Sequence, residues 1–305
     1  MNLYRRITLR TSNFYLYAMT PMSTRRFLQI AGLAAAGLLL AACGKKEAPP
    51  APAPASVASA PAPAPAKVYV VGTDAAYAPF ESQNEKGEIV GFDIEVVQAA
   101  AKKAGIEVKF VNTPWEGIFN ALGQGDRDMV VSAVTITTER RQTMDFSEPY
   151  FDAQQLIAVK ESSKIAKFAD LKKLKVGVQT GTTGDEAVTK LMGKTSTNIK
   201  RFESTPLALK ELESGGVDAV VADNGVIIHY VANNPGGKFK TVADKEFVPE
   251  QYGVALKKGN SELLGKINKG LADIKADGTY DAIFTKYFGA APAKAAAAPA
   301  SATSK

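Results

Sequence analysis

Residues 122–133 read Leu-Gly-Gln-Gly-Asp-Arg-Asp-Met-Val-Val-Ser-Ala, and residues 212–223 read Leu-Glu-Ser-Gly-Gly-Val-Asp-Ala-Val-Val-Ala-Asp. The two stretches share a leucine, a glycine, an aspartate and a Val-Val pair at a constant offset. Upstream lie Thr113-Pro114 and Thr205-Pro206, and the first pair predicts a helix with threonine as N-cap and proline at the first helical position. Each copy predicts a helix, a glycine turn and a buried strand. Two such copies predict two similar α/β lobes rather than one large sheet.

Strands and helices also alternate outside the repeat. Continuous apolar runs at 68–71 and 108–111 are typical of buried strands, and Ile94, Val97 and Ala101 share one face of a helix between them. Such alternation predicts parallel sheets with right-handed crossovers. Ligands of open parallel sheets bind beyond the carboxyl ends of the strands. Polar residues end strands in both lobes, so we expect a site between the lobes, at Asp74 and Tyr77, 132–140, 180–184 and Asp223.

The segment after the first repeat ends in hydroxyls and arginines. Apolar residues at 129–134 are followed by Thr135, Thr137 and Thr138 and then by Glu139-Arg140-Arg141. A strand that ends in hydroxyls and leads to an arginine suits a small anion. The pattern is weak by itself, because the three charged residues also fit a solvated helix face.

The charged residues at the strand ends match an amino-acid zwitterion. Arg140 can hold a carboxylate through two parallel hydrogen bonds, and Asp74 and Asp223 can each accept an ammonium group. One guanidinium, one carboxylate and a spare carboxylate therefore fit an amino acid with a cationic side chain. Tyr77 and Trp115, the only tryptophan, can stack on an alkyl or guanidinium group. The alternative for both rings is core packing.

The sequence offers little support for nucleotide binding, catalysis or metal binding. Gly181-Thr-Thr-Gly184 opens a helix and offers N–H groups and hydroxyls to an anion, but it lacks the lysine of a P-loop. The single histidine, His229, follows an apolar run and is predicted to be structural. No Gly-x-Ser-x-Gly elbow and no Ser-x-x-Lys pair is present, and one histidine with one cysteine cannot form a zinc cluster. We therefore expect no catalytic residue, no metal and no cofactor.

Most of the net charge of +6 comes from an N-terminal leader. Residues 1–42 contain five arginines and no acidic residue, so the remaining chain has 37 − 5 = 32 basic against 31 acidic side chains. That balance argues against a nucleic-acid partner. Arg25-Arg26 precede an apolar run at 27–42 that is too short for a membrane span of about 20 residues. Residues 1–42 therefore predict an export signal, whose true start is expected at Met22.

The apolar run ends in Leu40-Ala-Ala-Cys43, and Cys43 is the only cysteine. This segment resembles a bacterial lipoprotein lipobox, which implies that Cys43 is lipidated and becomes the mature N-terminus. The alternative is an unpaired buried cysteine. Residues 43–66 then form an extended Pro/Ala tether, and 290–305 is a similar low-complexity tail that we expect to be disordered. The folded body is predicted at 67–289.

Motifs of one family run through this body in order: Gly72-Thr-Asp-Ala-Ala-Tyr-Ala-Pro-Phe-Glu81, Gly91-Phe-Asp-Ile94, Thr135-Ile-Thr-Thr-Glu-Arg-Arg141, Asp145-Phe-Ser-Glu-Pro-Tyr150, Gly181-Thr-Thr183, Asp277-Gly-Thr-Tyr280 and Tyr287-Phe-Gly289. On these motifs the chain resembles the periplasmic solute-binding proteins (family 3) of polar and basic amino-acid ABC transporters. The family includes the lysine/arginine/ornithine-, histidine- and glutamine-binding proteins.

The resemblance implies an α/β fold, the type II two-lobed periplasmic-binding-protein fold, with two parallel-sheet domains joined by a two-strand hinge. The two chain crossings would fall near 150–155 and 251–254. Lobe 1 would then comprise 67–153 plus 252–289, and lobe 2 would comprise 154–251.

The resemblance also implies ligand contacts at Asp74, Tyr77, Trp115, Ser132, Ala133, Thr135, Arg140, Gln179, Thr182, Thr183 and Asp223. Arg140 would clamp the α-carboxylate, helped by backbone N–H groups of Thr135 and Thr183. Asp223 and the Thr135 hydroxyl would hold the α-ammonium. Arg141 is expected to be solvated.

The other implied contacts surround the ligand side chain. Asp74 would face its distal charge, and Tyr77 and Trp115 would sandwich its aliphatic part. Ser132 and Gln179 would line the far end of the pocket.

Three departures from the family pattern leave the ligand open. Ala133 stands where some lysine and histidine binders carry a second serine, Gly184 where they carry glutamine, and Ala222 where the glutamine binder has histidine. Arginine, lysine, ornithine, histidine and glutamine all remain candidates, with the basic arginine/lysine type favoured. We expect a lipid-anchored periplasmic monomer that delivers its ligand to an inner-membrane ABC permease. A cyclohexadienyl dehydratase-like enzyme and a sensor are the alternatives.

Overall fold

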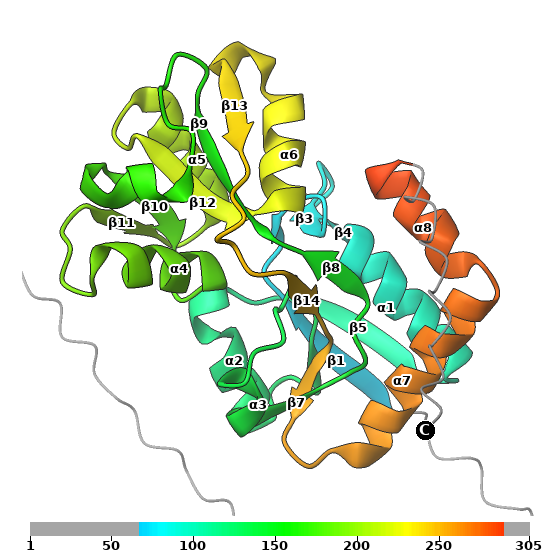
Figure 1. Cartoon of the computed structure of the whole chain (residues 1–305). Coiled ribbons are helices and arrows are strands. Elements are labelled where there is room, and N and C mark those ends of the chain that lie inside the picture. Colours follow the sequence, from blue (N-terminus) through cyan, green and yellow to red (C-terminus); the bar gives the residue numbers. More distant parts are fainter. Residues whose placement is uncertain (1–66, 290–305) are drawn as a thin grey trace, which may run out of the picture. The chain divides into compact units, whose positions relative to one another are not determined.

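The computed structural model describes residues 67–289 (Figure 1). The export signal at 1–42, the lipidation of Cys43, the tether at 43–66 and the tail at 290–305 are predictions that lie outside these residues. None of the described helices is long and apolar enough to cross a membrane.

The first of two five-stranded sheets contains the N-terminal strand of the described chain. In sheet order its strands are β5 (Glu107–Asn112), β1 (Val68–Thr73), β6 (Met129–Val130), β15 (Ala255–Lys257) and β7 (Met144–Phe146). Strand β1 is parallel to β5 and β6, whereas β15 is antiparallel to β6 and β7. The accompanying helices are α1 (Phe92–Lys103), α2 (Trp115–Gln124), α3 (Arg140–Thr143), α7 (Ser261–Ala276) and α8 (Thr279–Phe288).

Both faces of this sheet are covered, because its strand residues alternate between two apolar clusters. Val71 and Met129 belong to the cluster that includes α1 and α7, while Val130 belongs to the cluster that includes Ile118 and Leu122 of α2. Burial on both faces explains the continuous apolar runs of β1 and β6.

The second five-stranded sheet has the order β11 (Ile199–Phe202), β10 (Val176–Gln179), β12 (Ala219–Asp223), β9 (Gln155–Lys160) and β13 (Phe239–Val242). Strand β10 is parallel to β11 and β12, and β9 is antiparallel to β12 and β13. Its helical elements are η1 (Phe168–Lys173), α4 (Thr183–Met192), α5 (Thr205–Ser214), α6 (Asn224–Asn233) and η2 (Pro235–Gly237). Figure 1 shows α4 and α5 on opposite sides of these strands, matching the two apolar clusters that cover the sheet.

The chain passes between the two sheets twice, through β8 (Phe151–Ala153) and β14 (Glu250–Tyr252), which pair with each other in an antiparallel ribbon. The parallel strands predicted for each lobe are present, and the predicted two-lobed type II fold with a two-strand hinge is confirmed. The sheets also contain antiparallel strands, because β9 and β15 enter directly from this ribbon. A small separate sheet contains β2 (Ala76–Tyr77), β3 (Glu81–Gln83) and β4 (Ile89–Val90).

The internal repeat is a structural repeat. Gly125 and Gly215 end α2 and α5 in the left-handed region, at φ 89° and 86°, where a residue without a Cβ is favoured. Asp128 accepts a 2.8 Å hydrogen bond from the backbone N–H of Val70 in β1, and Asp218 accepts one of 2.8 Å from that of Lys175, just before β10. The same residue types therefore turn the chain from helix to strand in both lobes.

The predicted helix start at the first Thr-Pro pair is wrong in detail. Helix α2 begins at Trp115 with Pro114 in the N-cap position and without a side-chain cap, and the hydroxyl of Thr113 donates instead to the carbonyl of Val111 over 3.0 Å. In the second copy α5 begins at Thr205 with Ser204 as the N-cap, so Pro206 is the second residue of the helix. A hydroxyl can satisfy a nearby carbonyl as well as a helix N-terminus, so the residue type alone does not decide between the two.

Candidate functional site

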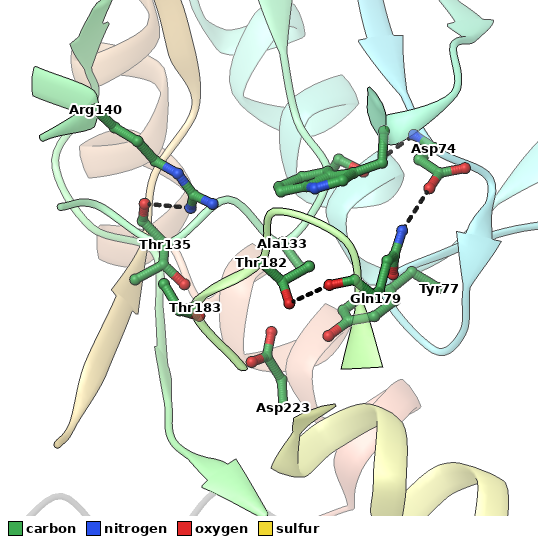
Figure 2. Close-up of a pocket in the computed structure, with 11 residues that line it drawn as sticks. Asp74, Tyr77, Ala133, Thr135, Arg140, Gln179, Thr182, Thr183 and Asp223 are labelled. Carbon is green, nitrogen blue, oxygen red and sulfur yellow. Dashed lines mark hydrogen bonds between the residues drawn. The ribbon is translucent and has the colours of Figure 1, made fainter. Parts of the chain in front are cut away.

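The eleven predicted ligand contacts all line one pocket (Figure 2). They are Asp74, Tyr77, Trp115, Ser132, Ala133, Thr135, Arg140, Gln179, Thr182, Thr183 and Asp223. Most of them lie at or just beyond the carboxyl ends of β1, β6, β10 and β12 or at the starts of α3 and α4, while Tyr77 belongs to β2 and Trp115 opens α2. Both lobes therefore contribute. The structure brings these side chains together, and their binding of a ligand stays a prediction.

Arg140 lies at one end of the pocket, opposite Asp74 (Figure 2). It opens α3, and its Nη1 donates to the carbonyl of Thr135 over 2.9 Å. The guanidinium carbon lies 5.4 Å from the ring centroid of Trp115 and 5.3 Å from that of Phe119. In the part of the chain that the structure describes, it forms no ion pair with a carboxylate, and burial lowers its pKa. The rings hold the guanidinium in place, and its remaining N–H groups can bind an anion.

Asp74 lies at the other end, directly after β1. Its Oδ2 accepts a hydrogen bond of 3.2 Å from Gln179 Nε2, and its backbone N–H donates to Ser132 Oγ over 3.0 Å. Gln179 is held by Thr205, whose N–H and hydroxyl donate to Oε1 over 3.2 and 2.9 Å. Burial raises the pKa of Asp74, and no cationic side chain within the described residues forms an ion pair with it. This carboxylate can therefore accept a cation from a ligand.

Asp223 ends β12 and is drawn below and between the other two charged residues in Figure 2. Its carboxylate accepts hydrogen bonds from Gln155 Nε2 and the hydroxyl of Tyr252. Burial, and then the charge of Glu250, raise the pKa of Asp223 to about 6, and hydrogen bonds from Tyr252, Tyr77 and Gln155 oppose that rise. A ligand ammonium group would supply the missing positive charge.

Thr182 and Thr183 belong to the helix start that faces the pocket. Thr182 is the N-cap of α4, and its hydroxyl accepts from the N–H of Asp185 over 3.2 Å and donates to the carbonyl of Gln179 over 2.9 Å. This cap orders the turn between β10 and α4. The first turn of the helix then presents backbone N–H groups and its positive dipole end to the pocket.

Two further carboxyl groups, Glu81 and Asp93, lie fully buried beneath the pocket. Asp93 accepts from the backbone N–H of Ala133 over 2.8 Å and from the hydroxyl of Tyr150 over 2.7 Å, and Glu81 accepts from the hydroxyl of Ser132 over 3.1 Å. Burial raises the pKa of Asp93 to about 6 and that of Glu81 well above its ordinary value. Because Ala133 has a φ of 47°, unusual for a residue with a Cβ, Asp93 stabilises a strained turn in the pocket wall.

The aromatic residues of the pocket have core contacts as well as exposed surface. Tyr77 stacks on Phe80 at a centroid distance of 6.3 Å, and Trp115 packs edge to face with Phe119 at 4.9 Å. Trp115 also reaches across to the second lobe, where its Nε1 lies 3.9 Å from the position of a Cβ on Gly181. Both rings stay half-buried. Their predicted contact with a ligand side chain remains open.

Sequence reasoning missed three residues that hold the pocket from behind. Gln155 opens β9, and Glu250 and Tyr252 belong to β14. The side chains of Gln155 and Tyr252 bind Asp223, and Glu250 accepts from two threonines of the pocket wall. A signal was present, because all three lie in or beside the predicted chain crossings.

Residues that were predicted to be solvated or structural lie outside the pocket lining. Arg141 is exposed, and His229 is half-buried on α6, where burial lowers its pKa. Within the described residues, no group of three or more His, Cys, Asp or Glu side chains could hold a metal ion.

Known proteins are similar to this chain in sequence and in architecture. A probable histidine-binding protein of Neisseria gonorrhoeae is 44% identical over 262 residues, which is 85% of this chain and 94% of that protein. The structure of the arginine-, lysine-, histidine-binding protein ArtJ from Geobacillus stearothermophilus is similar with a TM-score of 0.72 and 46% identity, over 74% of this chain and 97% of that one. An ancestral amino acid-binding protein, a precursor of cyclohexadienyl dehydratase, has a TM-score of 0.65 and 40% identity over 72% of this chain and 95% of its own.

A family model also matches the chain, over residues 69–290, and it describes the bacterial extracellular solute-binding proteins, family 3. The match includes both sheets, the ribbon that joins them and every residue of the pocket. This chain belongs to family 3 of the bacterial extracellular solute-binding proteins.

Proposed function

We propose that this chain binds a polar L-amino acid, with a basic side chain of the arginine or lysine type favoured, and delivers it to the permease of an ABC transporter. The supporting observation is a set of three charged groups that form no ion pair within residues 67–289, with Arg140 and Asp74 at opposite ends of the pocket and Asp223 between them. A basic amino acid carries a carboxylate, an ammonium group and a distal cation that can meet these groups in that order. Isothermal titration calorimetry against the twenty amino acids and ornithine tests this function.

The backbone groups of the ligand would be held at the Arg140 end of the pocket. Arg140 and the N–H groups of Thr135 and Thr183 would bind the α-carboxylate. Asp223 would bind the α-ammonium together with the hydroxyl of Thr135. That hydroxyl donates to Glu250 over 2.6 Å, so its lone pairs stay available to accept from an ammonium group.

The side chain of the ligand would extend toward Asp74. Tyr77 and Trp115 would lie on either side of its aliphatic part. Ser132 and Gln179 would line the far end, where Gln179 holds the Asp74 carboxylate by a hydrogen bond of 3.2 Å. A carboxylate at this end favours a cationic group over a neutral one, because a buried charge without a partner is unfavourable.

The names of the similar proteins support a basic ligand. One is described as binding histidine and another as binding arginine, lysine and histidine. The departures at Ala133, Gly184 and Ala222 still leave glutamine as an alternative. The similar ancestral protein that preceded a dehydratase raises a second candidate, an enzyme on the same scaffold. We propose a binding protein, because the three charged groups suffice to hold a zwitterion.

We further propose how the chain is processed and divided. Residues 1–42 would be removed as an export signal, and Cys43 would carry the lipid that anchors a periplasmic monomer to a membrane. Lobe 1 would comprise 67–153 plus 252–289, and lobe 2 would comprise 154–251. The β8–β14 ribbon would be the hinge about which the lobes close on the ligand.

The variant Asp74→Asn tests the basic preference. We expect it to raise the Kd for arginine by about 10-fold or more, because the ligand cation loses a charged hydrogen-bond acceptor. Glutamine, which carries a neutral amide, should lose little or no affinity. Calorimetry measures both, with Asp126→Asn as the matched control on an exposed turn. Equal arginine affinity in Asp74→Asn and wild type would show that Asp74 does not meet a cation.

The raised pKa of Asp223 predicts a pH dependence of binding. The free carboxyl titrates at about pH 6, and a bound ammonium group favours its charged form. Affinity should therefore fall as the pH drops through about 6, by about 10-fold between pH 7 and pH 5. The ionisable groups that face Asp223 are Glu250, Tyr252, Tyr77 and Arg140. Calorimetry at several pH values measures the effect, and a constant affinity over this range would contradict the role of Asp223.

A further inference from the structure

Glu250 belongs to the ribbon between the two sheets, and its side chain contacts residues of both lobes. It is the first residue of β14 and pairs with Ala153 of β8. Its Oε2 accepts from the hydroxyl of Thr135 over 2.6 Å and from the hydroxyl of Thr183 over 2.9 Å. Its Oε1 accepts from Gln155 Nε2 over 3.0 Å. One carboxylate therefore ties together three side chains from separate segments.

The two threonines belong to opposite walls of the pocket. Thr135 follows β6 of the first sheet, and Thr183 opens α4 on the second sheet. Glu250 does not line this pocket and instead lines neighbouring hollows on the outer side of the threonines. If the lobes moved apart, one carboxylate could not keep both hydroxyl contacts. Thr135 and Thr183 can therefore both donate to Glu250 only while the two pocket walls are close to each other.

The hydrogen bonds to Glu250 also fix which atoms face a ligand. A hydroxyl has one proton, so a threonine that donates to Glu250 can only accept from a third group. Thr135 is thereby set to accept from an ammonium group. Gln155 Nε2, which donates to Glu250, also donates to Asp223. Glu250 thus orients both groups that are proposed to hold the ligand ammonium.

All three donors to Glu250 are neutral. Among the described residues, no lysine, arginine or histidine forms an ion pair with it. Its negative charge acts on Asp223, where it helps raise the pKa. A bound ammonium group would then be attracted by two carboxylates and would contact one of them.

We propose that Glu250 is a positioning residue for ligand binding, which joins the walls of the two lobes and sets the Thr135 hydroxyl and Asp223 to receive the α-ammonium group. This inference rests on the proposed amino-acid binding and deepens it. Glu250 acts through Thr135, Thr183 and Gln155 and does not contact the ligand.

The test compares Glu250→Ala and Glu250→Gln in the full chain with wild type, using L-arginine and L-histidine as probes. Calorimetry gives the Kd, and the emission of Trp115, the only tryptophan, gives an independent titration from within the pocket. We expect Glu250→Ala to raise the Kd by about 10-fold or more, because three donors lose a charged acceptor. Glu250→Gln should have a smaller effect, since an amide can accept from only one side.

The matched control is Gln251→Ala, at the next position of β14. Gln251 is exposed, and its Nε2 donates to Asp152 of the paired strand β8 over 2.9 Å. This variant disturbs the same strand without touching the pocket threonines, so the Kd should stay within about twofold of wild type. Thermal unfolding checks that each variant folds, and the near-isosteric Glu250→Gln keeps the test valid if Glu250→Ala does not fold.

The pH dependence of ligand affinity shows whether Glu250 positions the binding groups or only stabilises the fold. Removing the charge of Glu250 should lower the pKa of Asp223, whose other facing ionisable groups are Tyr77, Tyr252 and Arg140. The fall in ligand affinity on acidification should therefore occur at a lower pH in Glu250→Gln than in wild type. Glu250 is not among the groups that shift Asp93, the other carboxyl with a pKa of about 6 beneath the pocket. Glu250 also raises the pKa of Glu186, but Glu186 does not line the pocket, so we assign the shift in the affinity profile to Asp223.

Wild-type affinity in both Glu250 variants would overturn the proposal while leaving amino-acid binding intact. An affinity loss in Glu250→Gln without a shift of the pH profile would also overturn it, because Glu250 would then only support the ribbon. If the wild-type protein bound none of the amino acids, the proposed function itself would fall, and the inference with it.

Discussion

Arg140→Ala is expected to weaken amino-acid binding by at least ~3 kcal/mol, which is about 100-fold or more in Kd. The guanidinium is held between the carbonyl of Thr135 and the rings of Trp115 and Phe119, and it has no carboxylate partner in the described chain. Its loss would leave the ligand α-carboxylate in the pocket without a counter-charge. Most of the effect is the cost of that unpaired charge.

Two further variants serve as comparisons for Arg140→Ala. Arg140→Lys keeps the charge but loses the planar fork, so it should bind more weakly than wild type and more tightly than Arg140→Ala. Arg141→Ala is the matched control, because Arg141 is exposed and its guanidinium carbon lies 5.8 Å from the ring centroid of Phe146. Calorimetry should show nearly wild-type binding for Arg141→Ala. Unchanged affinity in Arg140→Ala would remove Arg140 from the site.

Asp223→Asn is expected to have an effect of similar size, about 2–5 kcal/mol in binding free energy. Asp223 is buried at the end of β12, and the pocket offers no other side chain in a comparable position for an α-ammonium group. An asparagine keeps one oxygen that can accept from Gln155, and its amide nitrogen can donate to the hydroxyl of Tyr252, so the local structure should persist. The variant should therefore bind poorly and unfold at a denaturant concentration no lower than wild type, because a buried carboxylate has been neutralised.

The control for this variant lies on the same stretch of chain. Asp218 precedes β12 and accepts a 2.8 Å hydrogen bond from the backbone N–H of Lys175, outside the pocket. Asp218→Asn should leave the affinity close to wild type and can lower stability slightly. Calorimetry and urea unfolding measure the two properties separately. If Asp223→Asn bound arginine as tightly as wild type, the ammonium would have to bind elsewhere.

The fold could be predicted from short local signals. Gly125 and Gly215 end helices in the left-handed region in both copies of the repeat, and this conformation is the reason why glycine recurs there. Asp128 and Asp218 each bind a backbone N–H in or just before the neighbouring strand. The hydroxyl run before Arg140 also has a local reason, since the N–H of Arg140 donates to Thr137 Oγ1 over 3.1 Å.

The polar ends of the strands predicted where the pocket lies, and the family motifs predicted its individual contacts, but the residues behind the pocket could not be predicted. Glu250 lies 115 residues from Thr135 along the chain, and no periodicity connects the two positions. Gln155 and Tyr252 are likewise brought to Asp223 by the ribbon, which exists only once both sheets have formed. Asp93 reads as an ordinary acidic residue in the first turn of a helix, yet it is fully buried. Its partners belong to distant segments, so sequence alone gave no reason to bury it.

Calorimetric titration of the purified protein with the twenty amino acids and ornithine tests the central claim most directly. The account predicts micromolar or tighter binding of at least one basic amino acid, with one ligand per chain. Binding should weaken in Arg140→Ala and should be unaffected in Arg141→Ala. Failure to bind any of these amino acids, or turnover of a prephenate-type substrate by the same protein, would contradict the account.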